Sequence, residues 1–150
     1  MAVLEIGCGP GFFFIDMAKM VGSSGRVIAA DLQEGMLQKL RDKIRETELE
    51  ERIILYKCED DKIGVSEKID FVLLFYMVHE VPNKDALFNE IGTILKPNGQ
   101  ILIVEPPFYV SKKAFEDTVK IAHDAGLTVV ERPKIFLNKT AILKKGDSII

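Results

Sequence analysis

The sequence begins with a short apolar strand that runs directly into a glycine-rich loop. Residues 3–11 read Val-Leu-Glu-Ile-Gly-Cys-Gly-Pro-Gly, and residues 12–20 have the composition of a helix. A strand, a glycine-rich turn and a helix N-terminus together form a site where a ligand can approach the backbone closely. Gly7 and Gly9 can adopt positive φ or leave room where a Cβ would collide. The opening therefore predicts a ligand-binding loop in an α/β fold.

The rest of the chain alternates apolar strands with amphipathic helices. After the first strand, further strands are expected at residues 26–31, 52–58, 69–77, 100–105, 127–131 and 139–144, and further helices at 34–46, 83–95 and 111–125. Such alternation predicts right-handed crossovers and a parallel sheet. No helix separates the last two strands, so we expect them to pair antiparallel as a hairpin. Residues 59–68 are expected to be a polar loop, and residues 96–99, Lys-Pro-Asn-Gly, predict a tight turn.

Composition and charge narrow the classes of function. The 150 residues are 47% hydrophobic and 29% charged, as expected of a single domain spanning residues 1–150. The net charge of −3 argues against a nucleic-acid partner. No apolar run approaches the roughly 18 residues of a membrane span. Cys8 and Cys58 form neither a disulfide framework nor a metal-binding pattern, which favours a cytoplasmic protein without a metal.

The loop motif G-x-G-x-G, preceded by Glu5, resembles motif I of the class I S-adenosylmethionine-dependent methyltransferases. A dinucleotide-binding loop would read G-x-G-x-x-G, but Phe12 occupies the place of its last glycine, which disfavours a nicotinamide dehydrogenase. The resemblance implies a seven-stranded Rossmann-like α/β sheet in the order 3-2-1-4-5-7-6. It also implies an antiparallel strand 7, helices on both faces, and S-adenosylmethionine as cofactor with S-adenosylhomocysteine as product.

A carboxylate at the end of the second strand is the clearest cofactor contact outside the loop. Asp31 lies twenty residues after Gly11, and its oxygens suit two vicinal ribose hydroxyls. The alternative is an aspartate that caps the following helix. The resemblance gives Asp31 the same ribose-binding role and implies that Leu32 packs against adenine.

The remaining cofactor-binding candidates come from the other strand ends. In the acidic loop after the third strand, the resemblance implies a carboxylate that binds the adenine amine; Asp60 is the first choice and Glu59 the next, with a solvated acidic loop as the alternative. The backbone of Phe75 is expected near the amino-acid end of the cofactor, and Glu5 near its ammonium group. The full set of predicted cofactor-binding residues is Glu5, Gly7, Cys8, Gly9, Gly11, Asp31, Leu32, Glu59, Asp60 and Phe75.

Two residues, one near the end of the fourth strand and one just after it, are the candidates for catalysis. His79 can act as a general base or as a substrate contact, with a structural histidine as the alternative. Tyr76 is expected to line the cleft rather than to act as a catalytic phenol. Residues 105–108, Glu-Pro-Pro-Phe, resemble a motif of amino-group methyltransferases. That motif follows strand 4 and does not begin with Glu, so we assign it no function.

The sequence thus predicts transfer of a methyl group to a small-molecule acceptor by in-line displacement. The alternative is an S-adenosylmethionine-binding module without its own catalysis, or one that needs a partner to complete the acceptor site. The first strand begins at residue 2, and a central strand needs a helix on each face. We therefore expect that an N-terminal helix is missing from this chain, or that a homodimer covers the bare face.

Overall fold

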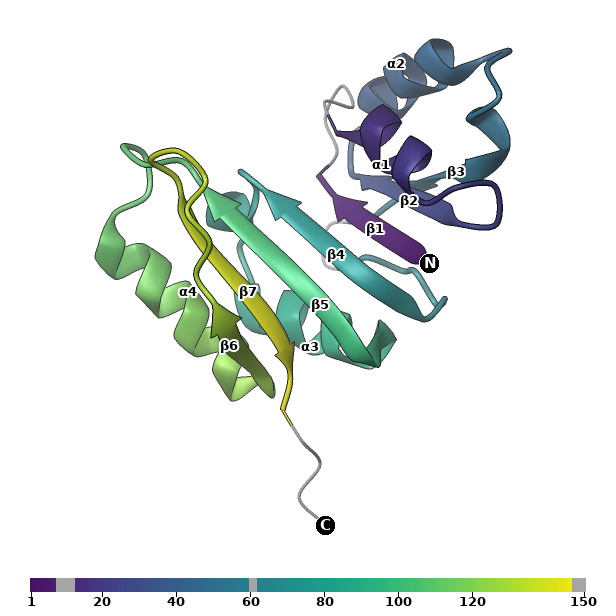
Figure 1. Cartoon of the computed structure of the whole chain (residues 1–150). Helices are drawn as coiled ribbons and strands as arrows, with labels where there is room; N and C mark the ends of the chain where they lie inside the picture. Colours follow the sequence, from purple (N-terminus) through teal and green to yellow (C-terminus); the bar gives the residue numbers. More distant parts are fainter. Residues whose placement is uncertain (8–12, 60–61, 147–150) are drawn as a thin grey trace.

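The computed structural model describes residues 1–7, 13–59 and 62–146, and these form one seven-stranded sheet with flanking helices (Figure 1). The strands are β1 (Ala2–Ile6), β2 (Arg26–Asp31), β3 (Ile53–Lys57), β4 (Ile69–Phe75), β5 (Leu95–Glu105), β6 (Leu127–Glu131) and β7 (Lys139–Lys145). The helices are α1 (Phe14–Met20), α2 (Glu34–Ile44), α3 (Lys84–Ile94) and α4 (Lys112–Asp124), with short 3-10 turns at η1 (Glu50–Arg52) and η2 (Val78–Glu80).

The sheet has the predicted order, β3-β2-β1-β4-β5-β7-β6. Strands β1 to β5 are parallel, and β7 runs antiparallel to both β5 and β6. The predicted fold class and terminal hairpin are therefore confirmed.

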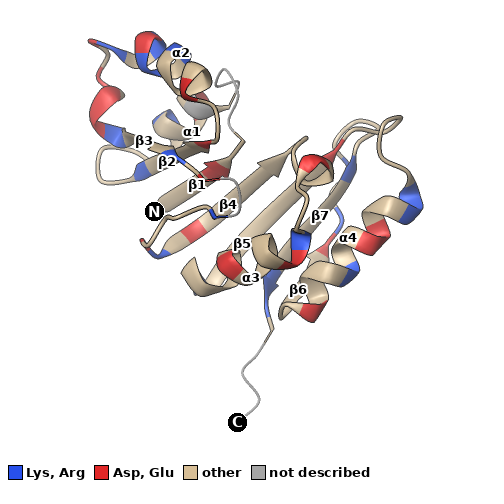
Figure 2. Cartoon of the chain, turned by 180° about the vertical axis from the view of Figure 1, so that it is seen from behind, with Lys and Arg blue, Asp and Glu red and all other residues tan. Residues whose placement is uncertain are grey.

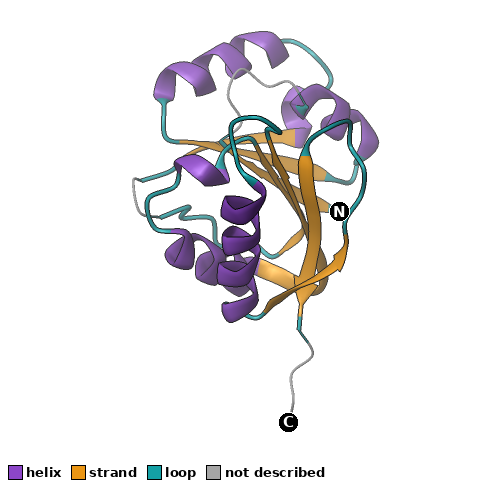
Figure 3. Ribbon diagram, turned by 90° about the vertical axis from the view of Figure 1, so that its left-hand side faces the viewer, coloured by secondary structure: helices purple, strands orange, loops and turns teal. Residues whose placement is uncertain are grey.

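Helices cover both faces of the sheet because successive strand residues point to opposite sides (Figure 3). Leu4 and Ile28 belong to the apolar core shared with α3 and α4, whereas Val3 and Val27 belong to the core shared with α1 and α2. Both β1 and β2 are buried on both faces, which explains their near-continuous apolar sequence.

Local sequence signals determine where α3 and α4 begin and end. The side chain of Asn83 accepts a hydrogen bond from the backbone of Ala86, and that of Ser111 accepts one from Ala114. These bonds satisfy backbone donors that the first helical turn leaves unpaired. Gly126 follows α4 with a φ of +88°, as predicted for a residue that ends a helix.

The structure corrects two predictions about backbone geometry. Strand β4 ends at Phe75 rather than at residue 77, because Tyr76 adopts a φ of +56° and turns the chain away. The tight turn predicted at residues 96–99 is instead a bulge within β5. Leu95 pairs with Ile69 and Gln100 pairs with Phe71, so four residues of β5 face one residue of β4.

The segment between β3 and β4 is less polar than predicted. Ile63 and Val65 are buried in the core. The Glu90 carboxylate on α3 accepts hydrogen bonds from the backbone N–H groups of Ile63 and Gly64, each at 2.8 Å. This carboxylate anchors the segment against the helix, so part of the predicted polar loop belongs to the core.

One part of the sheet carries no helix within the described residues. On the side where α1 and α2 lie, strands β4, β5 and β7 are uncovered (Figures 1 and 3). Phe71, Leu102 and Ile142 on this side are only half-buried. The bare face was expected from the position of the first strand, and the homodimer that would cover it stays a prediction. Among the described residues, none of the helices is long and apolar enough to cross a membrane.

Candidate functional site

A cavity of about 610 Å³, here called the first cavity, lies beyond the carboxyl ends of β1, β2, β3 and β4. The strand order reverses between β1 and β4, and open α/β sheets bind ligands at such a point. Of the predicted site residues, the structure brings five together in the wall of this cavity: Gly7, Asp31, Leu32, Glu59 and Tyr76.

Gly7 follows the end of β1 and lines the first cavity. Its φ is +69°, and its N–H donates a hydrogen bond to the carbonyl of Ala30 at 2.8 Å. A Cβ built on Gly7 would lie 3.2 Å from the Cβ of Met77. Both the backbone conformation and the close neighbour therefore require a residue without a side chain.

Asp31 ends β2 at the wall of the first cavity. It is 9% exposed, and its Oδ1 accepts a hydrogen bond from the Gln33 N–H at 2.8 Å. Gln33, not Asp31, is the N-cap residue of α2, so the structure does not favour the capping alternative. Leu32 is half exposed and lines the same cavity.

The segment after β3 contributes a thiol and a carboxylate to the same wall. Cys58 is buried, and desolvation, together with the charges of Asp31 and Glu90, raises the pKa of its thiol to about 11. The backbone of Glu59 forms an isolated bridge with Lys62. The remaining predicted residues of these two loops, Cys8, Gly9, Gly11 and Asp60, lie outside the described residues.

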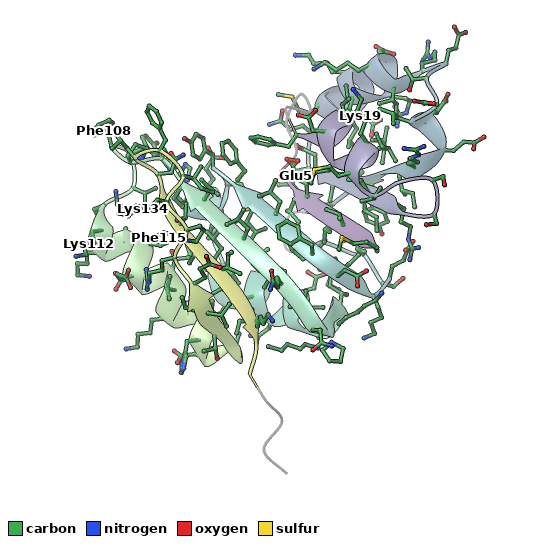
Figure 4. All side chains as sticks on the ribbon, viewed as in Figure 1. Glu5, Lys19, Phe108, Lys112, Phe115 and Lys134 are labelled. Carbon is green, nitrogen blue, oxygen red and sulfur yellow. The ribbon has the colours of Figure 1, made fainter. Side chains whose placement is uncertain are left out.

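Two further cofactor candidates do not line the first cavity. Glu5 is buried in β1, and its Oε2 has no hydrogen-bond partner among the described residues. Burial raises the pKa of its carboxyl to about 8. The ring of Phe75 stacks on Tyr76, with centroids 4.0 Å apart, and meets Phe13 edge-on at 4.7 Å. Figure 4 places Glu5 near the carboxyl end of β1.

His79 faces a second cavity of about 730 Å³, and Glu80 lines both cavities. The second cavity is lined by polar and charged groups of α3, α4, the end of β5 and the loop after β5: Lys84, Glu105, Tyr109, Asp117 and Thr118. The two catalytic candidates are thus separated, because Tyr76 lines the first cavity and His79 lines the second.

A buried carboxylate holds His79 in place. Glu105 is 1% exposed, and its Oε2 accepts a hydrogen bond from the backbone N–H of His79 at 3.1 Å. Both carboxylate oxygens lie 3.1–3.2 Å from the Nδ1 atom of the ring. A carboxylate at Nδ1 assigns the proton to that nitrogen and leaves Nε2 as an acceptor. Burial raises the pKa of Glu105, and the hydrogen bond and charge of His79 oppose that rise.

Sequence reasoning missed the role of Glu105. The residue was set aside with the Pro-Pro motif that follows it. The signal was nevertheless present: Glu105 ends strand 5, which the predicted order places beside strand 4, and His79 follows strand 4. A carboxylate and a histidine at the ends of adjacent parallel strands are expected to lie close together.

Comparison with known proteins identifies the family. Residues 1–139 match the family model described as a methyltransferase domain. The chain belongs to this methyltransferase family. The predicted resemblance is therefore confirmed.

Known proteins similar to this methyltransferase domain include quinone-pathway enzymes. It is 34% identical over 103 residues to a demethylmenaquinone methyltransferase of Lactobacillus johnsonii, covering 68% of this chain and 42% of that protein. It is 27% identical over 120 residues to a ubiquinone/menaquinone biosynthesis C-methyltransferase of Vibrio vulnificus, covering 79% and 45%. This methyltransferase domain thus spans less than half the length of these relatives.

A solved structure with a similar fold is a SAM-dependent methyltransferase from Aquifex aeolicus. The TM-score is 0.84 at 26% identity, and the match covers 96% of this chain and 81% of that chain. Most of the fold of this methyltransferase domain therefore has a counterpart in a known methyltransferase.

Proposed function

We propose that this domain transfers the methyl group of S-adenosylmethionine to a small-molecule acceptor. The observation that carries the proposal is the first cavity, which lies at the point where the strand order reverses in a chain of the methyltransferase family. The relatives named for demethylmenaquinone and ubiquinone biosynthesis favour a quinone precursor as the acceptor. The buried free thiol of Cys58 supports a reducing compartment such as the cytoplasm.

The residues of the first cavity fit this cofactor. The carboxylate of Asp31 can accept hydrogen bonds from two ribose hydroxyls, and the exposed face of Leu32 offers an apolar contact to a base. Outside the lining of that cavity, the oxygen of Glu5 without a partner among the described residues is a buried acceptor suited to an ammonium group, which would also favour the ionised carboxyl. When bound, S-adenosylmethionine supplies an electrophilic methyl group on a sulfonium sulfur.

The task of the protein is then to orient the acceptor and to remove its proton. Holding two reactants in line can lower the activation free energy by about 7–11 kcal/mol. We propose that the acceptor enters from the second cavity and gives a proton to Nε2 of His79. Glu105 beside Nδ1 holds the ring in one orientation and stabilises the imidazolium that results. Phenolic and carbon acceptors need such a base because their nucleophilic forms are deprotonated.

The second candidate function, a binding module without its own catalysis, is favoured by one observation. His79 lines the second cavity rather than the first, so the proposed base and the proposed cofactor site meet only beside Glu80. A module of this kind would bind S-adenosylmethionine and S-adenosylhomocysteine but would methylate no acceptor.

Titration calorimetry on the wild type and on Asp31→Ala tests the cofactor assignment. We expect S-adenosylmethionine to bind the wild type and to lose about 1–3 kcal/mol of binding free energy in the variant, since a charged hydrogen-bonding group is removed. Asp124→Ala, which removes an exposed carboxylate at the end of α4, is the matched control and should bind as the wild type does.

Formation of S-adenosylhomocysteine with reduced demethylmenaquinone and other small hydroquinones then separates the two candidates. Turnover supports the enzyme, whereas binding without turnover on any acceptor supports the module. Equal affinities of the wild type and Asp31→Ala would contradict the ribose assignment, and NADH binding in place of S-adenosylmethionine would contradict both functions.

A further inference from the structure

Two loops at one end of the sheet expose large apolar side chains that the proposed chemistry does not use. Phe108 and Tyr109 lie between β5 and α4 and are 92% and 78% exposed. Phe136 and Leu137 lie between β6 and β7 and are 94% and 63% exposed, and Ile135 beside them is also exposed. We call these five residues the aromatic lip. Soluble proteins rarely gather large exposed apolar side chains in one place without a binding partner.

The structure holds the two loops side by side (Figure 1). Glu105 of β5 pairs with Lys139 of β7 at the base of both loops, and the Lys139 Nζ donates a hydrogen bond to the Pro107 carbonyl at 2.8 Å. At the tip, Phe136 has a φ of +55°, a conformation that costs energy for a residue with a bulky side chain. Because the side chain is almost fully exposed, internal packing does not repay that cost.

The two segments that carry the aromatic lip differ in charge from the rest of the chain. Residues 106–113 and 132–139 contain five Lys or Arg and no Asp or Glu, whereas the whole chain has 20 basic and 23 acidic residues. The remaining residues therefore have 15 basic and 23 acidic side chains. Figure 2 shows Lys and Arg at the start of α4, beside the loop.

Some of these cations remain available for an external partner. Arg132 pairs with Glu116 at 2.7 Å, and Lys113 pairs with Asp117 at 3.0 Å. Lys112 and Lys134 form no ion pair with any described residue, and both are exposed. Figure 4 shows Lys112, Lys134 and Phe108 at the same end of the molecule.

We propose that the aromatic lip docks on the surface of an anionic lipid bilayer. Lysine is depleted at protein–protein interfaces, whereas bilayer interfaces take up aromatic and aliphatic side chains and attract basic ones. The lip combines both features, as interfacial segments of peripheral membrane proteins do. Charge complementarity therefore favours anionic headgroups over a second copy docked lip to lip, because the basic segments of the two lips would repel each other.

Docking would place the second cavity at the membrane. The ring of Tyr109, a lip residue, lies 5.1 Å from that of His79, and both line the second cavity. An amphiphilic acceptor could then pass from the bilayer to His79 without crossing water. This last step rests on the proposed function, but docking itself does not.

Vesicle co-sedimentation tests the docking. Vesicles of phosphatidylcholine alone are compared with vesicles that contain about one quarter phosphatidylglycerol, at low and high salt. We expect at least about tenfold stronger partitioning to the anionic vesicles, and weaker partitioning at high salt. The double variant Phe108→Ser/Phe136→Ser should partition about tenfold more weakly, and Lys112→Glu/Lys134→Glu should lose the preference for anionic lipid.

The matched control is Lys19→Glu/Met20→Ser, which changes an exposed cation and an exposed apolar residue at the end of α1, away from the lip (Figure 4). It should partition as the wild type does. Absence of vesicle binding, or an equal loss in the control, would overturn the proposal. If vesicle binding is absent, two other results would point to a different partner and overturn the proposal. One is a dimer in sedimentation velocity, and the other is binding to a single-stranded oligonucleotide. Calorimetry with S-adenosylmethionine in free solution tests the cofactor site separately, so the two proposals can fail independently.

Discussion

The two cavities that meet at Glu80 are built in different ways. Backbone turns and short segments that follow β1 to β4 form the first cavity, and Gly7 and Asp31 have positions there that local sequence patterns predict. In the second cavity, His79 after β4 meets Glu105 at the end of β5, and no local motif marks that contact. The proposed cofactor contacts therefore follow local motifs, whereas the proposed acceptor chemistry depends on tertiary packing between adjacent strands.

The largest expected effect separates the two cavities by function. His79→Ala should lower the turnover number by about 100- to 10,000-fold, which is the range of a lost general base. The affinity for S-adenosylmethionine should change little, because His79 does not line the first cavity. Single-turnover kinetics and calorimetry on the same preparation measure both quantities. Partial rescue of turnover by added imidazole would identify a proton-transfer role, and unchanged turnover would exclude His79 as the base.

A smaller effect is expected from the residue that orients His79. Glu105→Gln should lower turnover by about 10- to 100-fold, because hydrogen bonds of a charged group contribute about 1.5–3 kcal/mol. The backbone N–H of His79 can still donate to the amide oxygen, so the turn should persist. Glu51→Gln is the control, since Glu51 is exposed in η1 and lines neither cavity. If Glu105→Gln unfolds the domain instead, the carboxylate has a structural role and the orienting role is refuted.

The smallest expected effect concerns the buried carboxyl of Glu5 in β1 and needs no substrate. Burial raises the pKa of Glu5 in the folded protein to about 8 from an ordinary value of 4.5, so the folded state keeps a proton that the unfolded state releases between these values. The stabilising contribution is therefore full below pH 4.5 and is lost as pH rises towards 8. Urea unfolding of wild type and Glu5→Gln at several pH values should show a difference in free energy that grows by at least about 1 kcal/mol over this range.

Glu48→Gln, at an exposed position, is the control for this pH series and should follow the wild type. Saturating S-adenosylmethionine should reduce the pH dependence of the wild type, because an ammonium group beside Glu5 favours the ionised carboxyl. Parallel curves for wild type and Glu5→Gln would show that the carboxyl does not titrate in this interval.

Much of the fold could be predicted because its signals are local. Alternating apolar strands and amphipathic helices predicted the parallel sheet, and the absence of a helix between the last two strands predicted the antiparallel hairpin. Asn83, Ser111 and Gly126 marked helix ends through bonds and dihedral angles that involve only neighbouring residues. The bulge at residues 96–99 could not be predicted, since it depends on pairing with β4.

By itself, the sequence determined the class of fold, the family and the positions of Gly7 and Asp31 beside the first cavity. The class of fold follows from periodicity and the position of Gly7 from conformational limits on a single residue, both of which act within a few positions of the chain, whereas the family came from the resemblance of residues 5–11 to motif I. Only the tertiary structure showed that Glu105 binds His79, that Glu5 is buried with an unpartnered oxygen, and that two distant loops form one basic aromatic surface. Those features depend on which strands become neighbours and on how completely water is excluded between them. The strand order was implied by resemblance to a known family, but residue patterns along the chain do not record which side chains meet at the strand ends or how completely water is excluded there.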